Sequence, residues 1–161
     1  MKYFFLAIAS FLAIVAQMIA GNNFFLFNFL DLSLLLIAYW AIYRSGTQAL
    51  FVGSLTGLLM DAVLGWPLGY NGFGRTLAAF VIGQAAKKFN VGETWIRFVI
   101  IASSSCLSTL SIFVLSWLLQ RSSDRIFLGA SLMQSLITAG VGVVLFAALD
   151  SHNQAQARRA D

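Results

Sequence analysis

Residues 47–86 read TQALFVGSLTGLLMDAVLGWPLGYNGFGRTLAAFVIGQAA, and this segment indicates the architecture of the chain. Two apolar runs, Thr47–Leu64 and Tyr70–Ala86, are separated by Gly65–Gly69. A helix of about 17–25 apolar residues is long enough to cross the hydrocarbon core of a bilayer. Pro67 and the two glycines that flank it are typical of a tight turn. The segment therefore predicts two antiparallel membrane-spanning helices joined by a compact hairpin turn.

The composition of the whole chain agrees with a membrane protein. Apolar residues make up 60% of the 161 residues and charged residues make up 10%. In ordinary soluble domains, charged residues make up about 25%. So much apolar surface must face lipid or a partner. The composition therefore excludes a disordered chain, a nucleic-acid-binding domain and an ordinary cytosolic enzyme.

The sequence offers few residues for metal binding or catalysis. It has one cysteine, Cys106, and one histidine, His152. A cysteine metal site needs several thiolates, and a zincin helix needs two histidines at positions i and i+4. A hydrolase triad needs a base beside its nucleophile. We therefore expect a protein that is not an enzyme and that uses no metal and no cofactor.

Four further apolar runs have the length of a membrane span. Together with the first two they predict an all-α polytopic membrane protein with six transmembrane helices: Tyr3–Ala20, Phe24–Tyr43, Thr47–Leu64, Tyr70–Ala86, Ile96–Leu119 and Ile126–Leu149. The first run is interpreted as an uncleaved helix, because Met18 occupies position −3 of the best candidate signal-peptide cleavage site. Residues 1–149 then form a single transmembrane domain, and residues 150–161 form a polar cytoplasmic tail that we expect to fray.

Basic residues predict the orientation, because Lys and Arg are enriched on the cytoplasmic side of membrane proteins. With a cytoplasmic N-terminus, the cytoplasmic flanks carry Lys2, Arg44, Lys87, Lys88, Arg97, Arg158 and Arg159, and the outer flanks carry Arg75, Arg121 and Arg125. Six crossings then place both termini in the cytoplasm of a bacterial cell, with the helices in the inner membrane.

Charged residues inside membrane spans require an explanation, because each is expensive to insert. Asp31, Asp61 and Arg75 lie within the predicted spans, all in the outer half. We expect Asn28 to cap the second helix, with Asp31 in its first turn. We also expect Asp61 and Arg75 to form an ion pair across the hairpin, and we favour this structural interpretation. The alternative is an outward-facing polar pocket formed by Asp31, Asp61, Tyr70, Asn71 and Arg75.

Small residues recur at helical spacing, which lets two helix backbones approach closely. The third helix carries Gly53 and Gly57 as a G-x-x-x-G pattern, which is equally compatible with internal packing and with a partner helix. The first helix carries the pairs Ala9/Ala13 and Ala16/Ala20, and the fifth carries Ser104, Ser108 and Ser111. We favour internal packing for the serines, and we expect Cys106 among them to be a small buried residue.

Two segments carry a resemblance to a known family. Gly57-Leu-Leu-Met-Asp61-Ala-Val-Leu-Gly65-Trp-Pro67-Leu68-Gly69 resembles the G-L-x-x-D-x-x-x-G-x-P-L-G signature of the bacterial rod-shape-determining membrane protein family MreD. Leu34-Leu-Leu-Ile-Ala-Tyr39-Trp40-Ala41 resembles the second helix of that family, which ends in a Tyr-Trp pair. The family often has proline where this chain has Leu30, so the start of the second helix is a departure from the pattern.

The resemblance implies a non-catalytic membrane scaffold of the cell-elongation complex, which synthesises lateral peptidoglycan and maintains rod shape. It implies an MreC-like bitopic partner and, through it, MreB filaments, the RodA glycosyltransferase and a class B penicillin-binding transpeptidase. The site residues that we expect are Gly57, Asp61, Gly65, Pro67, Leu68 and Gly69 on the hairpin, Asp31, Tyr39 and Trp40 on the second helix, and Gly53 from the G-x-x-x-G pattern. Membrane lipid is the other expected neighbour.

The resemblance also implies a fold similar to the substrate-binding subunits of energy-coupling-factor transporters. That similarity leaves a second function open, namely binding of a vitamin-like small molecule in the outward-facing polar pocket. The small-residue faces of the first helix would then contact the energy-coupling subunit.

The predicted topology can be tested with reporter fusions. We expect fusions after Lys88 and after Asp161 to report the cytoplasm, and a fusion after Asp124 to report the outer side, because the basic residues favour that arrangement. A periplasmic signal from the Asp161 fusion would overturn the topology.

Overall fold

The computed structural model describes residues 2–23, 30–119 and 128–160, which contain helices and no strands. The helices are α1 (Lys2–Asn23), α2 (Leu32–Tyr43), α3 (Gly46–Leu64), α4 (Tyr70–Lys88), α5 (Thr94–Leu118) and α6 (Leu128–Ala160). The prediction of an all-helical chain is therefore confirmed.

Three of the described helices are long and apolar enough to cross a membrane, namely Gly46–Leu64, Thr94–Leu118 and Leu132–Ser151. Helix α2 has 12 residues, which corresponds to about 18 Å and is shorter than a hydrocarbon core of about 30 Å. Residues 24–29 of the second predicted span, including the expected cap Asn28, lie outside the described residues. The count of six spans therefore stays a prediction.

One expectation about a helix end is wrong. Asp31 is not in the first turn of α2; it is the N-cap, and its carboxylate accepts the backbone N–H of Leu34 at 2.9 Å. A capping carboxylate satisfies a donor that has no acceptor within the helix. Helix α6 continues to Ala160, so it includes residues 150–160 of the predicted tail, and fraying of that tail stays a prediction.

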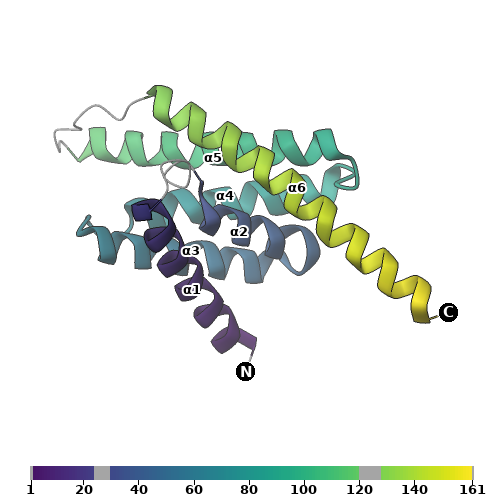
Figure 1. Cartoon of the computed structure of the whole chain (residues 1–161). Helices are drawn as coiled ribbons and strands as arrows, with labels where there is room; N and C mark the ends of the chain where they lie inside the picture. Colours follow the sequence, from purple (N-terminus) through teal and green to yellow (C-terminus); the bar gives the residue numbers. More distant parts are fainter. Residues whose placement is uncertain (1, 24–29, 120–127, 161) are drawn as a thin grey trace.

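Helices α3, α4 and α5 run side by side, and α1 and α6 cross them obliquely (Figure 1). Helix α6 packs against α5 and α2, whereas α1 packs against α2 and α3. Helices α1 and α6 are not packed against each other in the parts that the structure describes. The two helices diverge toward the chain termini, and the short helix α2 lies between them (Figure 1).

Glycines allow the α3–α4 pair to pack closely. A Cβ added to Gly57 would lie 2.5 Å from the backbone of Asn71 and Gly72, and one added to Gly53 would lie 2.7 Å from the carbonyl oxygen of Arg75. The G-x-x-x-G face of α3 is therefore covered by α4 and is not available to a partner. Gly74 likewise allows α4 and α5 to pack closely, because an added Cβ would lie 2.9 Å from the carbonyl oxygen of Ser108 on α5.

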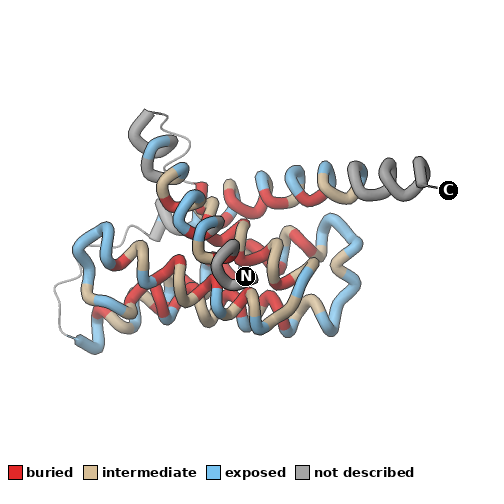
Figure 2. Tube along the Cα trace, turned by 90° about the horizontal axis from the view of Figure 1, so that it is seen from below, coloured by how far each residue is buried: buried red, intermediate tan, exposed pale blue. Residues whose placement is uncertain are grey.

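Apolar side chains fill the interior and also cover much of the outer surface. The buried residues concentrate where the helices meet, as Figure 2 shows, and they include Ile37, Ile82 and Phe146. Trp117 and Val144 are among many large apolar side chains that point outward, and they are 73% and 70% exposed. Extensive apolar exposure marks a surface that is covered by lipid or by a partner.

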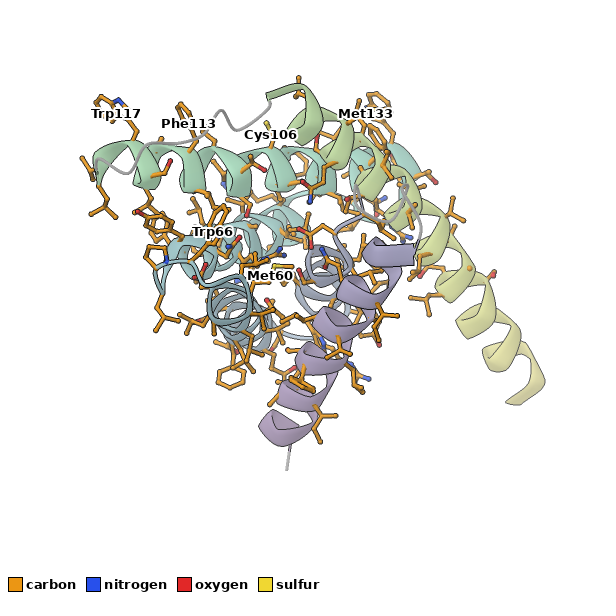
Figure 3. The ribbon with its side chains drawn as sticks, turned by 60° about the vertical axis from the view of Figure 1, so that its left-hand side comes forward. Met60, Trp66, Cys106, Phe113, Trp117 and Met133 are labelled. Carbon is orange, nitrogen blue, oxygen red and sulfur yellow. The ribbon has the colours of Figure 1, made fainter. Side chains whose placement is uncertain are left out.

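Cys106 is exposed, so the expectation that it fills a buried gap is wrong. Figure 3 places it with Phe113 and Trp117 along the outward face of α5. The three serines are buried, as expected for internal packing: Ser104, Ser108 and Ser111 lie on the inner face of α5.

Gly57→Ala tests the close approach of α3 and α4. We expect a loss of about 1–3 kcal/mol in unfolding free energy, because backbone atoms of α4 occupy the space that the methyl group needs. Gly83→Ala is the matched control, since its nearest neighbour would be 3.8 Å away. Unfolding in mixed micelles measures both variants, and equal stability of the two would contradict this packing.

Candidate interaction site

The buried carboxylate of Asp61 closes the α3–α4 hairpin. Its oxygens accept backbone N–H groups from Gly69 at 2.8 Å, Asn71 at 3.0 Å and Gly72 at 3.3 Å, and the side-chain amide of Asn71 at 2.9 Å. These donors lie at the N-terminus of α4, where the helix dipole favours a negative charge. Asp61 is 0% exposed, so the chain itself provides the solvation that water would otherwise supply.

The glycines of the turn make this closure possible. Gly65 ends α3 with a φ of 67°, and Gly69 precedes α4 with a φ of 110°. Both angles lie in the left-handed region, which glycine adopts without steric cost. Leu68, between them in the turn, is 72% exposed. The spacing of Asp61, Gly65 and Gly69 in the sequence motif thus corresponds to one physical unit, a capped hairpin.

Arg75 pairs with Asp31 and not with Asp61, so the expected ion pair across the hairpin is wrong. Arg75 Nη1 donates to Asp31 Oδ1 at 2.9 Å and also to the hydroxyl of Ser33. Ser33 in turn donates to Asp31 at 2.6 Å. The reason for the difference is that the α4 N-terminus already satisfies Asp61, whereas Asp31, the N-cap of α2, pairs with no other cation among the described residues. The pair ties α2 to α4.

The five residues of the predicted outward pocket form two neighbouring groups. Asp31 binds Arg75, and Asp61 binds Asn71, while all four are buried. Tyr70 is also buried. The polar atoms of this set mostly bond to one another; among the described residues, Arg75 Nε has no hydrogen-bond partner. The cluster therefore consolidates the hairpin end of the bundle, meaning the end that contains Gly65–Gly69.

A second cluster with a buried charge lies at the end of the bundle opposite the hairpin, and it was not predicted as a site. Arg97 Nη2 donates to Asp150 Oδ2 at 2.5 Å, and Arg97 Nε donates to the carbonyl oxygen of Val91. The hydroxyl of Tyr43 donates to Asp150 Oδ1 at 2.7 Å. Arg97 is only 6% exposed. Sequence reasoning assigned Arg97 and Asp150 to the cytoplasmic flanks, and the only signal of their pairing was their opposite charge at the same predicted end.

The aromatic pair of α2 adjoins this cluster. The Tyr39 and Trp40 rings meet edge to face with centroids 5.7 Å apart, and Tyr39 lies 5.5 Å from the ring of Tyr43. The guanidinium of Arg44 lies 5.9 Å from the Trp40 ring centroid, within the range of a cation–π contact. These contacts fix the C-terminal end of α2.

An apolar groove opens between α1, α2 and α6. Its volume is about 280 Å³, and it is lined by Ala13, Leu32, Leu35, Leu36, Tyr39, Leu145 and Phe146. Helix α2 forms the floor, and α1 and α6 form the two walls. Ala13 belongs to one of the Ala-x-x-x-Ala patterns of the first helix, so a small residue lies on the wall of the groove.

The described residues contain no cluster of three or more His, Cys, Asp or Glu side chains that could hold a metal ion. The acids at the two polar clusters are bound to arginine or to backbone N–H groups. The arrangement is suited to packing and recognition.

These features define a helical membrane protein whose buried charges are neutralised within the chain. The family model of rod shape-determining protein MreD matches residues 1–149, and the chain belongs to that family. The family is associated with the MreB and MreC cell-shape machinery and is not known for enzymatic activity. No curated protein and no solved structure matches the chain.

A double-mutant cycle tests the observed pairing. We expect Asp31→Asn and Arg75→Gln to couple by about 1–3 kcal/mol in unfolding free energy, because each single change leaves a buried group unpaired. Asp61→Asn and Arg75→Gln should add within about 0.5 kcal/mol, because they share no bond. Reversible unfolding in mixed micelles measures both cycles. Coupling of Arg75 to Asp61 instead of Asp31 would contradict the observed geometry.

Proposed function

We propose that this chain is a non-catalytic scaffold of the cell-elongation complex, spanning the inner membrane six times with both termini in the cytoplasm. It binds the transmembrane helix of an MreC-like bitopic protein and through it influences lateral peptidoglycan synthesis. MreB filaments, the RodA glycosyltransferase and a class B penicillin-binding transpeptidase are the indirect partners. Membership of the MreD family supports a role of this chain in determining rod shape.

The observation that carries the proposal is the apolar groove between α1, α2 and α6. Association within lipid depends on close packing, because transfer of apolar surface from lipid to protein gains little. A concave apolar surface with a small residue on its wall provides that packing for one helix. The other small-residue face, formed by Gly53 and Gly57, is covered by α4, so α1 rather than α3 is the helix we assign to the partner.

The geometry gives no comparable support to vitamin binding. A small polar ligand needs several polar groups directed into a pocket. In the described residues, the carboxylates of Asp31 and Asp61 are engaged by Arg75 and by the N-terminus of α4. A ligand in that place would have to break these bonds.

Ala13→Leu tests the groove, because the larger side chain fills space that the partner helix would occupy. We expect co-purification of the MreC-like partner in mild detergent to fall about tenfold and the cells to become round, at an unchanged amount of folded protein. Ala62→Leu is the matched control, since Ala62 is an exposed residue of α3 outside the groove. Wild-type co-purification of the Ala13→Leu protein would contradict the proposal.

A further inference from the structure

We infer that Tyr43, Arg97 and Asp150 form a clamp that sets the position of α6 beside α2, and thereby the width of the groove between α1, α2 and α6. The inference rests on the proposed function, since it concerns the same groove. We call these three residues the α6 clamp.

The α6 clamp joins four parts of the chain at one point. Asp150 on α6 accepts from Tyr43 on α2 at 2.7 Å and from Arg97 on α5 at 2.5 Å. Arg97 also donates to the carbonyl oxygen of Val91, which lies in the connection before α5. Because Arg97 is buried, its charge depends on Asp150, and removal of one partner leaves the other unpaired in a poorly solvated place.

Helices α2 and α6 are held together at two levels. At the hairpin end, the backbone N–H of Asp31 donates to the hydroxyl of Thr138 at 3.1 Å, and at the opposite end Tyr43 bonds to Asp150. The distance along the helix axis from Asp31 to Tyr43 in α2 equals that from Thr138 to Asp150 in α6, and each is about 18 Å. The two helices therefore run in the same direction, and the groove residues of α2 and α6 lie between the two levels.

The two levels differ in how firmly they hold α6. Gly142, one turn after Thr138, packs against side chains of α2 and α5: an added Cβ would lie 2.8 Å from the terminal methyl group of Leu35 and 2.9 Å from that of Ile101. Close packing therefore fixes α6 near the hairpin end. At the opposite end the buried ring of Phe146 and the polar bonds to Asp150 together hold the helix, and the side chain of Asp150 remains 31% exposed. A change at Asp150 is thus expected to move this end of α6 and not the other.

Tyr43 connects the α6 clamp to the lining of the groove. Its ring lies 5.9 Å from that of Phe146 and 5.5 Å from that of Tyr39, and both of these residues line the groove. Phe146 precedes Asp150 by one helical turn. A shift of Asp150 therefore repositions Phe146 against α2 and changes the space open to a partner helix.

The test measures the separation of α1 and α6 in the full chain without a partner. Spin labels are placed at Phe11→Cys and Val144→Cys in a Cys106→Ala background, because both positions point outward. In lipid nanodiscs we expect Asp150→Asn to shift or broaden the distance distribution by at least ~2 Å, the size of a typical helix displacement. The conservative variant Asp150→Glu should stay close to the parent distribution.

Two further variants complete the experiment. Tyr43→Phe keeps the ion pair and removes one hydrogen bond, so it should fold and give a smaller shift of the same kind. Glu93→Gln is the control, because Glu93 is an exposed acid at the same end whose side chain forms no cap hydrogen bond. We expect it to have no effect on the distance.

Partner binding provides the second measurement. We expect Asp150→Asn to weaken co-purification of the MreC-like partner about tenfold and Glu93→Gln to leave it unchanged. Equal distance distributions for Asp150→Asn, Tyr43→Phe and Glu93→Gln would overturn the inference while leaving the groove proposal intact. A shifted distance with wild-type partner binding would also overturn it. The groove proposal is tested separately, and it is contradicted if the Ala13→Leu protein still binds the partner.

Discussion

A charge buried among membrane helices costs several kcal/mol unless another group of the same protein neutralises it. This chain meets that requirement at three places, and each one joins different helices. Asp61 on α3 binds the N-terminus of α4, and Arg75 on α4 binds Asp31 at the start of α2. Arg97 on α5 binds Asp150 on α6. The neutralising bonds therefore also link α3 to α4, α4 to α2 and α5 to α6.

This arrangement has consequences for function. Carboxylates that are bound to arginine or to backbone N–H groups are not placed to act as acids, bases or ligands, and the outer surface is largely apolar. Recognition by shape within the membrane is what such a surface offers. Because the described parts of α1 and α6 are not packed against each other, the short helix α2 is left as the floor of a groove of about 280 Å³. Membership of the MreD family places that groove in a protein of the cell-shape machinery.

Local features could be predicted from the sequence, and long-range pairings could not. The hairpin at Gly65–Gly69 follows from residues a few positions apart, so its turn and its antiparallel helices were predictable. Arg75 had two candidate acids, and only the three-dimensional position of the α4 N-terminus decides between them. Burial was also ambiguous, because apolar periodicity cannot distinguish a face that packs on another helix from one that faces lipid. For this reason Cys106 was expected to be buried, whereas it is exposed.

Photocrosslinking from within the membrane tests the central claim most directly. A photoreactive residue at Leu36 or Leu145 lies in the groove, whereas one at Trp117 lies on the outward face of α5. In cells that express the complete elongation complex, the account predicts crosslinks from both groove positions to the transmembrane segment of the MreC-like partner and none from Trp117. Crosslinks to the partner from Trp117, with only lipid captured at Leu36 and Leu145, would contradict it.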